Sequence, residues 1–309
     1  MADRELVVLG TASQAPTRER NHNGYLLRWD GDAVLFDPGE GTQRQFVLAD
    51  VAASSVRRIC ITHFHGDHCL GLPGVLMRLA ADGGRLPVPV HYPASGQAYF
   101  DRLCSASAGQ KWVPVEACPT TGRTTVECGA YAVRSVPLRH RVDTLGWRID
   151  EPDGRRMLPE RLGALGVTGA DIGRLQRDGT LAVDGRTVRL EDVSAARPGQ
   201  SVAVVMDTSW CDEALELARG VDLLVCEATF LTAEQHLATA YGHLTAREAG
   251  RLAALAGVRR LVLTHFSRRY RDLQPFADEA GAEFGDVVVA TDLARVPVPP
   301  RAVVAPDGA

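Results

Sequence analysis

The segment THFHGDH, residues 62–68, constrains the fold more than any other part of the sequence. It places three histidines and one aspartate within six positions, directly after the apolar run Ile-Cys-Ile. Zinc binds imidazole nitrogen and carboxylate oxygen at about 2.0–2.2 Å, and a helix cannot turn four such neighbours onto one point. We therefore expect a loop at a strand end, with His63 and His65 serving one metal ion and Asp67 and His68 serving a second.

Three further candidate ligands also follow apolar runs of strand length. His140 comes after VRSVPLR, Asp207 after SVAVVM and His265 after RLVLT. Strands that end at one edge of a sandwich deliver such groups rigidly to one point. Each of these residues taken alone would more often be an ordinary packed or surface group. Their joint occurrence with residues 62–68 favours a binuclear metal site.

Composition and hydrophobic pattern indicate an ordinary α/β protein. Of the 309 residues, 45% are hydrophobic and 23% are charged, and apolar runs of strand length are mixed with helical patterns in both halves. We expect one domain over residues 1–295, an αββα sandwich of two sheets flanked by helices. Residues 151–198 are rich in Gly, Arg and Asp, which predicts an arm-like insertion. Residues 296–309 are expected to form a Pro-rich tail outside the core.

Charge and cysteine content limit the class of protein further. The N-terminal segment is charged and no apolar run reaches the length of a membrane span, so we expect a cytoplasmic protein without membrane contact. Seven cysteines without a CxxC pair argue against a disulfide framework and against a cysteine zinc site. The net charge of −4 neither supports nor excludes an RNA ligand, because arginines cluster locally in PTRERN, EPDGRRMLPER and THFSRRYR.

The candidate ligands match, position by position, the metal-binding residues of two-zinc hydrolases of the metallo-β-lactamase fold. These residues are His63, His65, Asp67, His68, His140, Asp207 and His265. Further segments resemble the ribonuclease Z family of that superfamily: LGTASQAPTRERN, LFDPGEGTQRQ, GDHCLGLPG, CEATF, GHLTAREA and THFSRRY. Two family patterns differ, since Met206 stands where glycine is usual and Leu244 where serine is usual. Residues 165–179 resemble the family's tRNA-binding arm with a weaker Gly-Pro and lysine-rich character.

The resemblance implies a zinc-dependent endoribonuclease that removes the 3′ trailer from precursor tRNA. It implies two zinc ions per subunit, bridged by Asp207; imidazole and carboxylate ligands would also accept manganese, so the working metal stays open. Attack by a metal-bound hydroxide on the phosphodiester would leave a 3′-hydroxyl on the tRNA and a 5′-phosphate on the trailer. The resemblance also implies a homodimer in which the arm of one subunit holds tRNA at the active site of the other.

Candidate catalytic roles fall to three residues. Asp67 is a candidate general base as well as a ligand, because a carboxylate beside a metal-bound water lies within proton-transfer reach. The resemblance assigns protonation of the leaving group to His243 paired with Glu227, for which a structural salt bridge is the alternative.

Arginine matches phosphate bidentately. Two loops resemble phosphate-contacting segments, with candidate substrate contacts Arg18, Arg20, Ser267 and Arg269.

Two alternative functions stay open at this stage. The fold and its ligands are shared by small-molecule phosphodiesterases, thioester hydrolases and lactamases. The long insertion and the EATF, GHLTA and HFSRRY segments disfavour such a small-substrate enzyme. The second alternative is a non-catalytic RNA-binding protein, which would be expected to have lost at least one ligand, and none is missing here.

Overall fold

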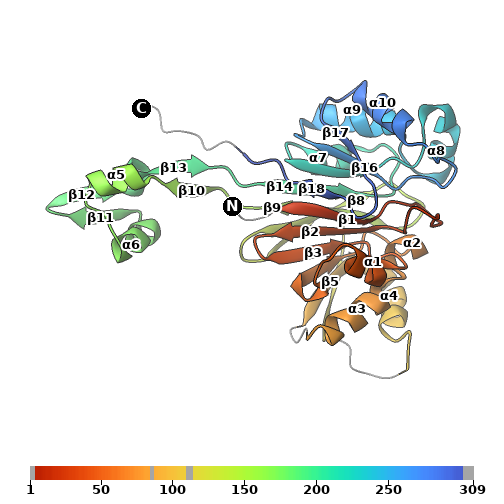
Figure 1. Ribbon diagram of the computed structural model, residues 1–309, viewed down its shortest axis with the longest axis horizontal. Helices are drawn as coiled ribbons and strands as arrows, with labels where there is room; N and C mark the ends of the chain where they lie inside the picture. The colour runs from red at the N-terminus through yellow and green to blue at the C-terminus, as the bar shows by residue number, and fades with distance from the viewer. Residues whose placement is uncertain (1–3, 84–86, 109–113, 302–309) are drawn as a thin grey trace.

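Two mixed seven-stranded sheets face each other, and helices cover both outer faces (Figure 1). The computed structural model describes residues 4–83, 87–108 and 114–301. The buried hydrophobic residues follow this layering, with one cluster between the sheets and one beneath each layer of helices. The αββα sandwich expected from the sequence is therefore confirmed.

The first sheet combines the N-terminal strands with one C-terminal strand. Its order is β18 (Arg295–Pro297), β1 (Glu5–Gly10), β2 (Gly24–Trp29), β3 (Asp32–Phe36), β4 (Val56–Cys60), β5 (Val88–Pro93) and β6 (Val115–Thr120). Helices α1 (Thr42–Leu48), α3 (Leu72–Ala81) and α4 (Gln97–Cys104) pack on its outer face. Because both faces of this sheet are covered, β1 to β3 are apolar along nearly their whole length.

The second sheet comes from the C-terminal half. Its order is β17 (Val287–Val289), β16 (Leu261–Thr264), β15 (Leu223–Glu227), β14 (Ser201–Val205), β9 (Thr144–Asp150), β8 (Ala132–Leu138) and β7 (Thr124–Glu127). Helices α7 (Asp212–Ala218), α9 (Ala246–Ala256) and α10 (Gln274–Gly281) cover its outer face. Strands β14, β15 and β16 are parallel, whereas β9 is antiparallel to both β14 and β8. Strands β8, β14 and β16 therefore end at the same edge of the sandwich.

An arm leaves the sandwich between β9 and β14. Strands β10 (Gly154–Met157) and β13 (Ser194–Arg197) pair as its stalk, and its head contains α5 (Pro159–Ala164), α6 (Ala170–Asp178), β11 (Thr180–Val183) and β12 (Arg186–Arg189). The head has a small core of its own, made of Leu162, Val167, Leu175, Val188 and Val193. The arm begins where β9 ends and returns where β14 begins, so it stands at the edge opposite the ends of β8 and β14. In Figure 1 it extends to the left, away from the body of the protein.

A buried carboxylate anchors the base of this arm. Glu151 accepts hydrogen bonds from Arg4 at 2.6 Å and from Arg197 at 2.7 Å, and its side chain is only 8% exposed. The Arg4 guanidinium also lies 4.3 Å from the ring centroid of Trp29. Burial alone would raise the pKa of Glu151, but the hydrogen bonds from Arg4 and Arg197 lower that pKa to about 2. The stalk is thus tied to the first sheet by an ionised group.

The prediction of a tail outside the core from residue 296 is wrong at its beginning. Strand β18 pairs with β1, and Val296 and Val298 are buried. The two valines alternate with prolines, so both face the core, and an edge strand tolerates proline because its outer N–H groups need no partner. Residues 302–309 lie outside the described residues. Within the described ranges, no helix is long and apolar enough to cross a membrane.

Candidate metal centre

The ligand segment is a loop that runs into a single helical turn. His63 and His65 lie on the loop after β4, as expected, but Asp67 and His68 belong to the short helix α2 (Gly66–Cys69). The expectation of a loop throughout is therefore wrong for its second half. The turn is compatible with binding, because Asp67 Oδ2 and His68 Nε2 still lie 3.4 Å apart, and His265 and Asp207 from elsewhere in the chain complete their group.

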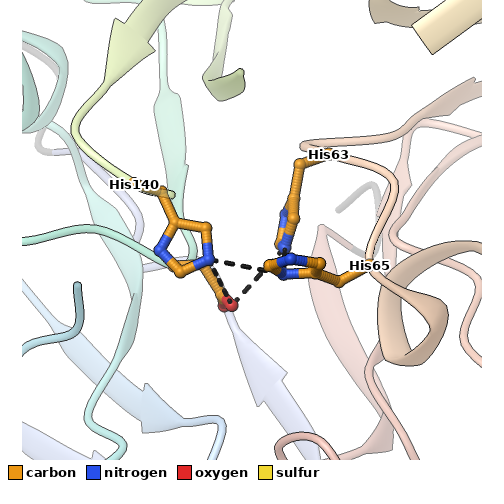
Figure 2. A group of neighbouring side chains, drawn as sticks. His63, His65 and His140 are labelled. Atoms are coloured by element: carbon orange, nitrogen blue, oxygen red, sulfur yellow. Dashed lines mark hydrogen bonds and ion pairs between the residues drawn. The ribbon is translucent and has the colours of Figure 1, made fainter. Parts of the chain in front are cut away.

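A first group of donor atoms joins the two halves of the protein. His63 and His65 approach from the loop after β4, and His140 from the loop after β8, as Figure 2 shows. His65 Nδ1 lies 2.9 Å from His63 Nε2 and 3.4 Å from His140 Nε2. Asp207 Oδ2 lies 3.5 Å from His63 Nε2 and 3.6 Å from His140 Nε2. Four atoms bound tetrahedrally to one zinc-sized ion would be about 3.3–3.6 Å apart, so the group fits such an ion.

A second group shares Asp207 with the first. Asp207 Oδ1 lies 3.2 Å from His68 Nε2 and 3.1 Å from His265 Nε2. Asp67 Oδ2 lies 3.4 Å from each of the same two nitrogens. Asp207 thus directs one carboxylate oxygen to each group, and its Oδ1 is buried with no hydrogen-bond partner among the described residues. A buried oxygen of this kind needs a cation or a donor.

Backbone strain accompanies this arrangement. Asp207 and His265 have positive φ angles of 25° and 64°, and Asp37 beside them has a φ of 45°. Residues other than glycine rarely adopt such values, and they do so mainly where the surrounding structure holds them for a function. The strand ends turn sharply here so that the side chains reach one point.

Four of the five candidate ligand imidazoles, those of His63, His68, His140 and His265, are held through their second nitrogen. His68 Nδ1 donates to Asp37 Oδ2 at 2.8 Å, and His63 Nδ1 donates to Thr62 Oγ1 at 3.0 Å. The Thr62 hydroxyl in turn donates to Asp37 Oδ2 at 2.7 Å, and the Thr62 amide to Asp37 Oδ1 at 2.6 Å. These bonds fix the tautomers and leave Nε2 of His63 and His68 facing the donor groups, where His68 Nε2 also lies 3.1 Å from the Asn23 side-chain amide.

The second sheet repeats this pattern. His265 Nδ1 donates to Thr229 Oγ1 at 2.7 Å, and that hydroxyl donates to Glu227 Oε2 at 2.6 Å. His140 Nδ1 donates to the Gly242 carbonyl at 2.9 Å. Sequence analysis missed Asp37 and Thr229, although Asp37 directly follows an apolar run, as Asp207 does.

The electrostatics suit cation binding. Burial and the nearby His68 lower the pKa of His63, which therefore stays neutral with a free lone pair. Burial opposes ionisation of Asp67, but His68 outweighs it and holds the pKa of Asp67 well below its usual range. Burial also opposes protonation of His68, yet the facing carboxylates of Asp207, Asp67 and Asp37 raise its pKa. Since metal ligands must be deprotonated, a divalent ion would replace the proton on His68 and balance these carboxylates.

His243 is presented beside the two groups by local helix signals. Gly242 ends α8 (Gln235–Tyr241) with a φ of 77°, a value that favours glycine. Two residues after His243, Thr245 caps α9, and the side chains of Thr245 and Glu248 form a capping box. Much of the GHLTAREA segment therefore serves to fix the position of this histidine.

His243 forms an ion pair with a fully buried carboxylate. Its Nδ1 donates to Glu227 Oε1 at 3.0 Å, and Glu227 also accepts from the Thr208 amide at 2.7 Å. Burial alone would lower the pKa of His243, but the charges of Glu227 and Asp207 raise it to about 9. The His243 side chain is 13% exposed, so a protonated imidazole borders the candidate metal centre.

The predicted substrate contacts separate into two kinds. Arg18 and Arg269 are exposed, and Arg269 Nε donates to Ser267 Oγ at 3.3 Å. Arg20 is buried, and its guanidinium donates to the backbone carbonyls of Ser267 and Tyr270 at 3.2 and 2.9 Å. The expectation that Arg20 binds phosphate is therefore corrected. Its buried guanidinium instead stabilises the SRRY loop through hydrogen bonds to the loop's backbone.

Known proteins match both the fold and the sequence. The Metallo-beta-lactamase superfamily model matches residues 17–109, and the Beta-lactamase superfamily domain matches residues 188–266. Ribonuclease Z of Nocardia farcinica is 59% identical over 304 residues, which cover 97% of this chain and 100% of that protein. The chain belongs to the ribonuclease Z family.

Other relatives agree with this assignment. Ribonuclease Z of Salinispora arenicola is 55% identical, with 98% of this chain and 99% of that protein covered. The crystal structure of human tRNase Z, short form, superposes with a TM-score of 0.68 at 25% identity, covering 96% of this chain and 99% of that one. Membership of the ribonuclease Z family confirms a hydrolytic, metal-dependent endoribonuclease of tRNA 3′ processing and decides against the two alternatives.

Proposed function

We propose that the chain removes the 3′ trailer of precursor tRNA with two zinc ions held at the two donor groups. The carrying observation is the carboxylate of Asp207, whose two oxygens face two different clusters of imidazole nitrogens. His63, His65 and His140 would complete one ion's ligands, and Asp67, His68 and His265 the other's. Imidazole and carboxylate donors also accept manganese, which would act as a substitute.

Bound metal ions of this kind supply a nucleophile from water at neutral pH and stabilise negative charge on the oxygens at phosphorus. Asp67 Oδ2 faces His68 and His265, and Asp67 is 9% exposed. An ionised carboxylate at this place can accept a proton from the attacking water as well as bind an ion. Asp67 is therefore our candidate for the general base.

His243 is our candidate for the proton donor to the leaving ribose oxygen. Its Nδ1 is engaged by Glu227, so a proton on Nε2 is available to a ligand. Two metal cations nearby would lower the pKa of His243. The negative charge of the buried Glu227 opposes this effect and favours the protonated imidazole. Water as the nucleophile leaves a 3′-hydroxyl on the tRNA and a 5′-phosphate on the trailer.

The arm is proposed to hold tRNA for a partner subunit. Strands β9 and β14 have 7 and 5 residues, which at about 3.3 Å per residue separate the arm base from the ligand edge by roughly 20 Å. The arm also points away from α2, which carries Asp67 and His68 (Figure 1). The active site of the same subunit is therefore badly placed to receive the end of an RNA molecule that this arm holds.

Exposed apolar side chains on and beside two neighbouring helices support a homodimer. Helices α1 and α3 pack against each other. Val47, Leu48, Leu70 and Met77, on or directly beside these helices, are 57%, 46%, 55% and 50% exposed. Apolar side chains gathered on one face mark an interaction site more often than isolated ones do. We propose that a second copy of the chain covers this face, and that the dimer works in the cytoplasm on precursor tRNA.

The N-terminal loop with Arg18 and the loop with Ser267 and Arg269 are proposed to contact the RNA backbone. Arg18 and Arg269 are exposed and carry the charge that phosphate groups need, and Ser267 adds a hydroxyl. Arg20 would contribute indirectly, because it holds the backbone of the loop that carries Ser267 and Arg269.

The test is cleavage of a 5′-labelled precursor tRNA with a 3′ trailer by the zinc-loaded protein. We expect one cut at the acceptor end, lost in Asp67→Ala. A variant in which a short Gly-Ser turn replaces residues 155–196 should lose most precursor cleavage but keep hydrolysis of bis(p-nitrophenyl) phosphate. Mixing this variant with Asp67→Ala should restore precursor cleavage, because only mixed dimers combine an intact arm with an intact site on the other subunit. An intact precursor with the wild type would reject the proposed substrate.

A further inference from the structure

An aromatic side chain stands inside the ligand segment without a role in metal binding. Phe64 lies between His63 and His65 and is half-buried. Its ring rests on Gly96, where an added Cβ would lie 2.1 Å from two ring carbons. Its edge meets Tyr92, with ring centroids 5.7 Å apart. These contacts hold the ring of Phe64 in place on the segment that carries two candidate metal ligands.

The ring of Phe64 continues into an exposed stack. Tyr99 on α4 lies nearly parallel to it, with centroids 5.8 Å apart and 28° between the ring planes. Tyr99 is 54% exposed, although large aromatic residues usually bury most of their surface. The guanidinium of Arg102, one helical turn later, lies 5.6 Å from the Tyr99 centroid. No ion pair joins Arg102 to a carboxylate in the part of the chain that the structure describes.

We propose that Phe64, Tyr99 and Arg102 form a stacking platform for an unpaired base next to the phosphodiester that is cut. This proposal rests on the endoribonuclease function. Aromatic faces bind every base through its π surface, and arginine adds a cation–π contact and charge for the adjacent phosphate. Such binding tolerates any sequence, as trailers of different tRNA precursors require.

The platform begins at a residue of the segment that carries the candidate metal ligands. Phe64 lies between His63 and His65 in the chain, so the platform starts on the same segment as two candidate ligands, and a nucleotide bound at the metal groups would place its base towards it. Gly96 keeps the platform preorganised, because any larger residue there would push the Phe64 ring away. The platform would thus set the position of the RNA strand, and Phe64, Tyr99 and Arg102 are positioning residues.

The decisive comparison pairs protein variants with altered substrates. Tyr99→Leu keeps an apolar side chain and helix propensity but loses the ring, whereas Tyr99→Phe keeps the ring and is the matched control. Each protein is given precursor tRNA that is unmodified, or abasic at the nucleotide on either side of the cleaved bond. Melting temperature and zinc content verify that the variants fold and load like the wild type.

On the unmodified precursor, kcat/KM of Tyr99→Leu is expected to fall about tenfold, as for the loss of one stacked base. Tyr99→Phe should match the wild type, and Arg102→Gln should show a smaller loss. On one of the two abasic precursors, the wild type and Tyr99→Leu should have the same kcat/KM. The base missing from that precursor is then the one that stacks on the platform. If the ratio of kcat/KM between the wild type and Tyr99→Leu is the same on all three substrates, the platform is overturned while the enzyme's function stands. Failure of the wild type to cut any precursor would overturn the function, and the platform with it.

Discussion

Replacing Asp37 by asparagine should weaken the metal group of His68 much more than that of His63. Asp37 accepts three hydrogen bonds, from the Thr62 amide, the Thr62 hydroxyl and His68 Nδ1. Asparagine has the same shape but one acceptor oxygen. With that oxygen on the Thr62 amide, its NH₂ group faces two donors, His68 Nδ1–H and the Thr62 hydroxyl. The imidazole of His68 must then turn or change tautomer.

The magnitude follows from the hydrogen bonds that asparagine cannot accept. A buried donor left without its acceptor costs about 1–3 kcal/mol, and here the donor is itself on a metal ligand. Loss of such an outer partner lowers metal affinity about 10- to 100-fold, or about 1.4–2.7 kcal/mol. His63 keeps its bond to Thr62 Oγ1, so we expect its group to change by less than about threefold.

Zinc content of the protein, measured across a series of chelator-buffered free-zinc concentrations, checks this prediction. The wild type should bind two equivalents per chain, and Asp37→Asn should show one step shifted to about 10- to 100-fold higher free zinc. Thr62→Ser keeps the hydroxyl and should behave like the wild type. If both steps of Asp37→Asn coincide with those of the wild type, the hydrogen bond to His68 does not support the metal.

Three further outcomes are expected. In Glu227→Gln the anion that raises the pKa of His243 is gone, so the alkaline limb of the kcat–pH profile should move to lower pH; an unmoved limb would argue against His243 as the acid. Glu151→Gln should lower the melting temperature at pH 7. Since the pKa of Glu151 drops from 4.5 to about 2 on folding, its stabilisation is complete above pH 4.5 and is lost as pH falls towards 2. The difference between wild type and variant should therefore shrink over that range, and a constant difference would refute the ion pair as its cause. If the proposed homodimer forms, Met77→Glu on α3 should convert it to monomers in sedimentation while retaining hydrolysis of a small diester; a persistent dimer would place the interface elsewhere.

The sequence predicts which donor residues meet, because their position follows from strand ends. His140, Asp207 and His265 each follow a mainly apolar strand, and for Asp207 and His265 that strand is fully buried, as strands between parallel neighbours usually are. The strands come together by hydrophobic burial, and the polar residue after each run then has to lie at the sheet edge. Periodicity and residue type are enough to locate these candidate ligands.

Other parts of the molecule depend on contacts that no local pattern contains. Strand β9 (TLGWRID) mixes charged and small residues, and it becomes a central strand only because β8 and β14 pair with both its edges. The arginines of the N-terminal loop look alike in sequence, yet Arg20 is buried against two carbonyls while Arg18 is exposed. The positive φ of Asp207 and of His265 is likewise imposed by the surrounding structure.

The ligands come from both sheets: His63, His65, Asp67 and His68 follow β4 of the first, and His140, Asp207 and His265 follow strands of the second. A metal ion bound there acts as a cross-link between two halves whose segments are far apart in the chain. Metal that binds only the folded state adds about 2.7 kcal/mol to the free energy of unfolding at a hundredfold excess over its Kd. Metal bound at the proposed site would thus couple the stability of the folded enzyme to metal supply, and removing metal would lower that stability as well as the activity.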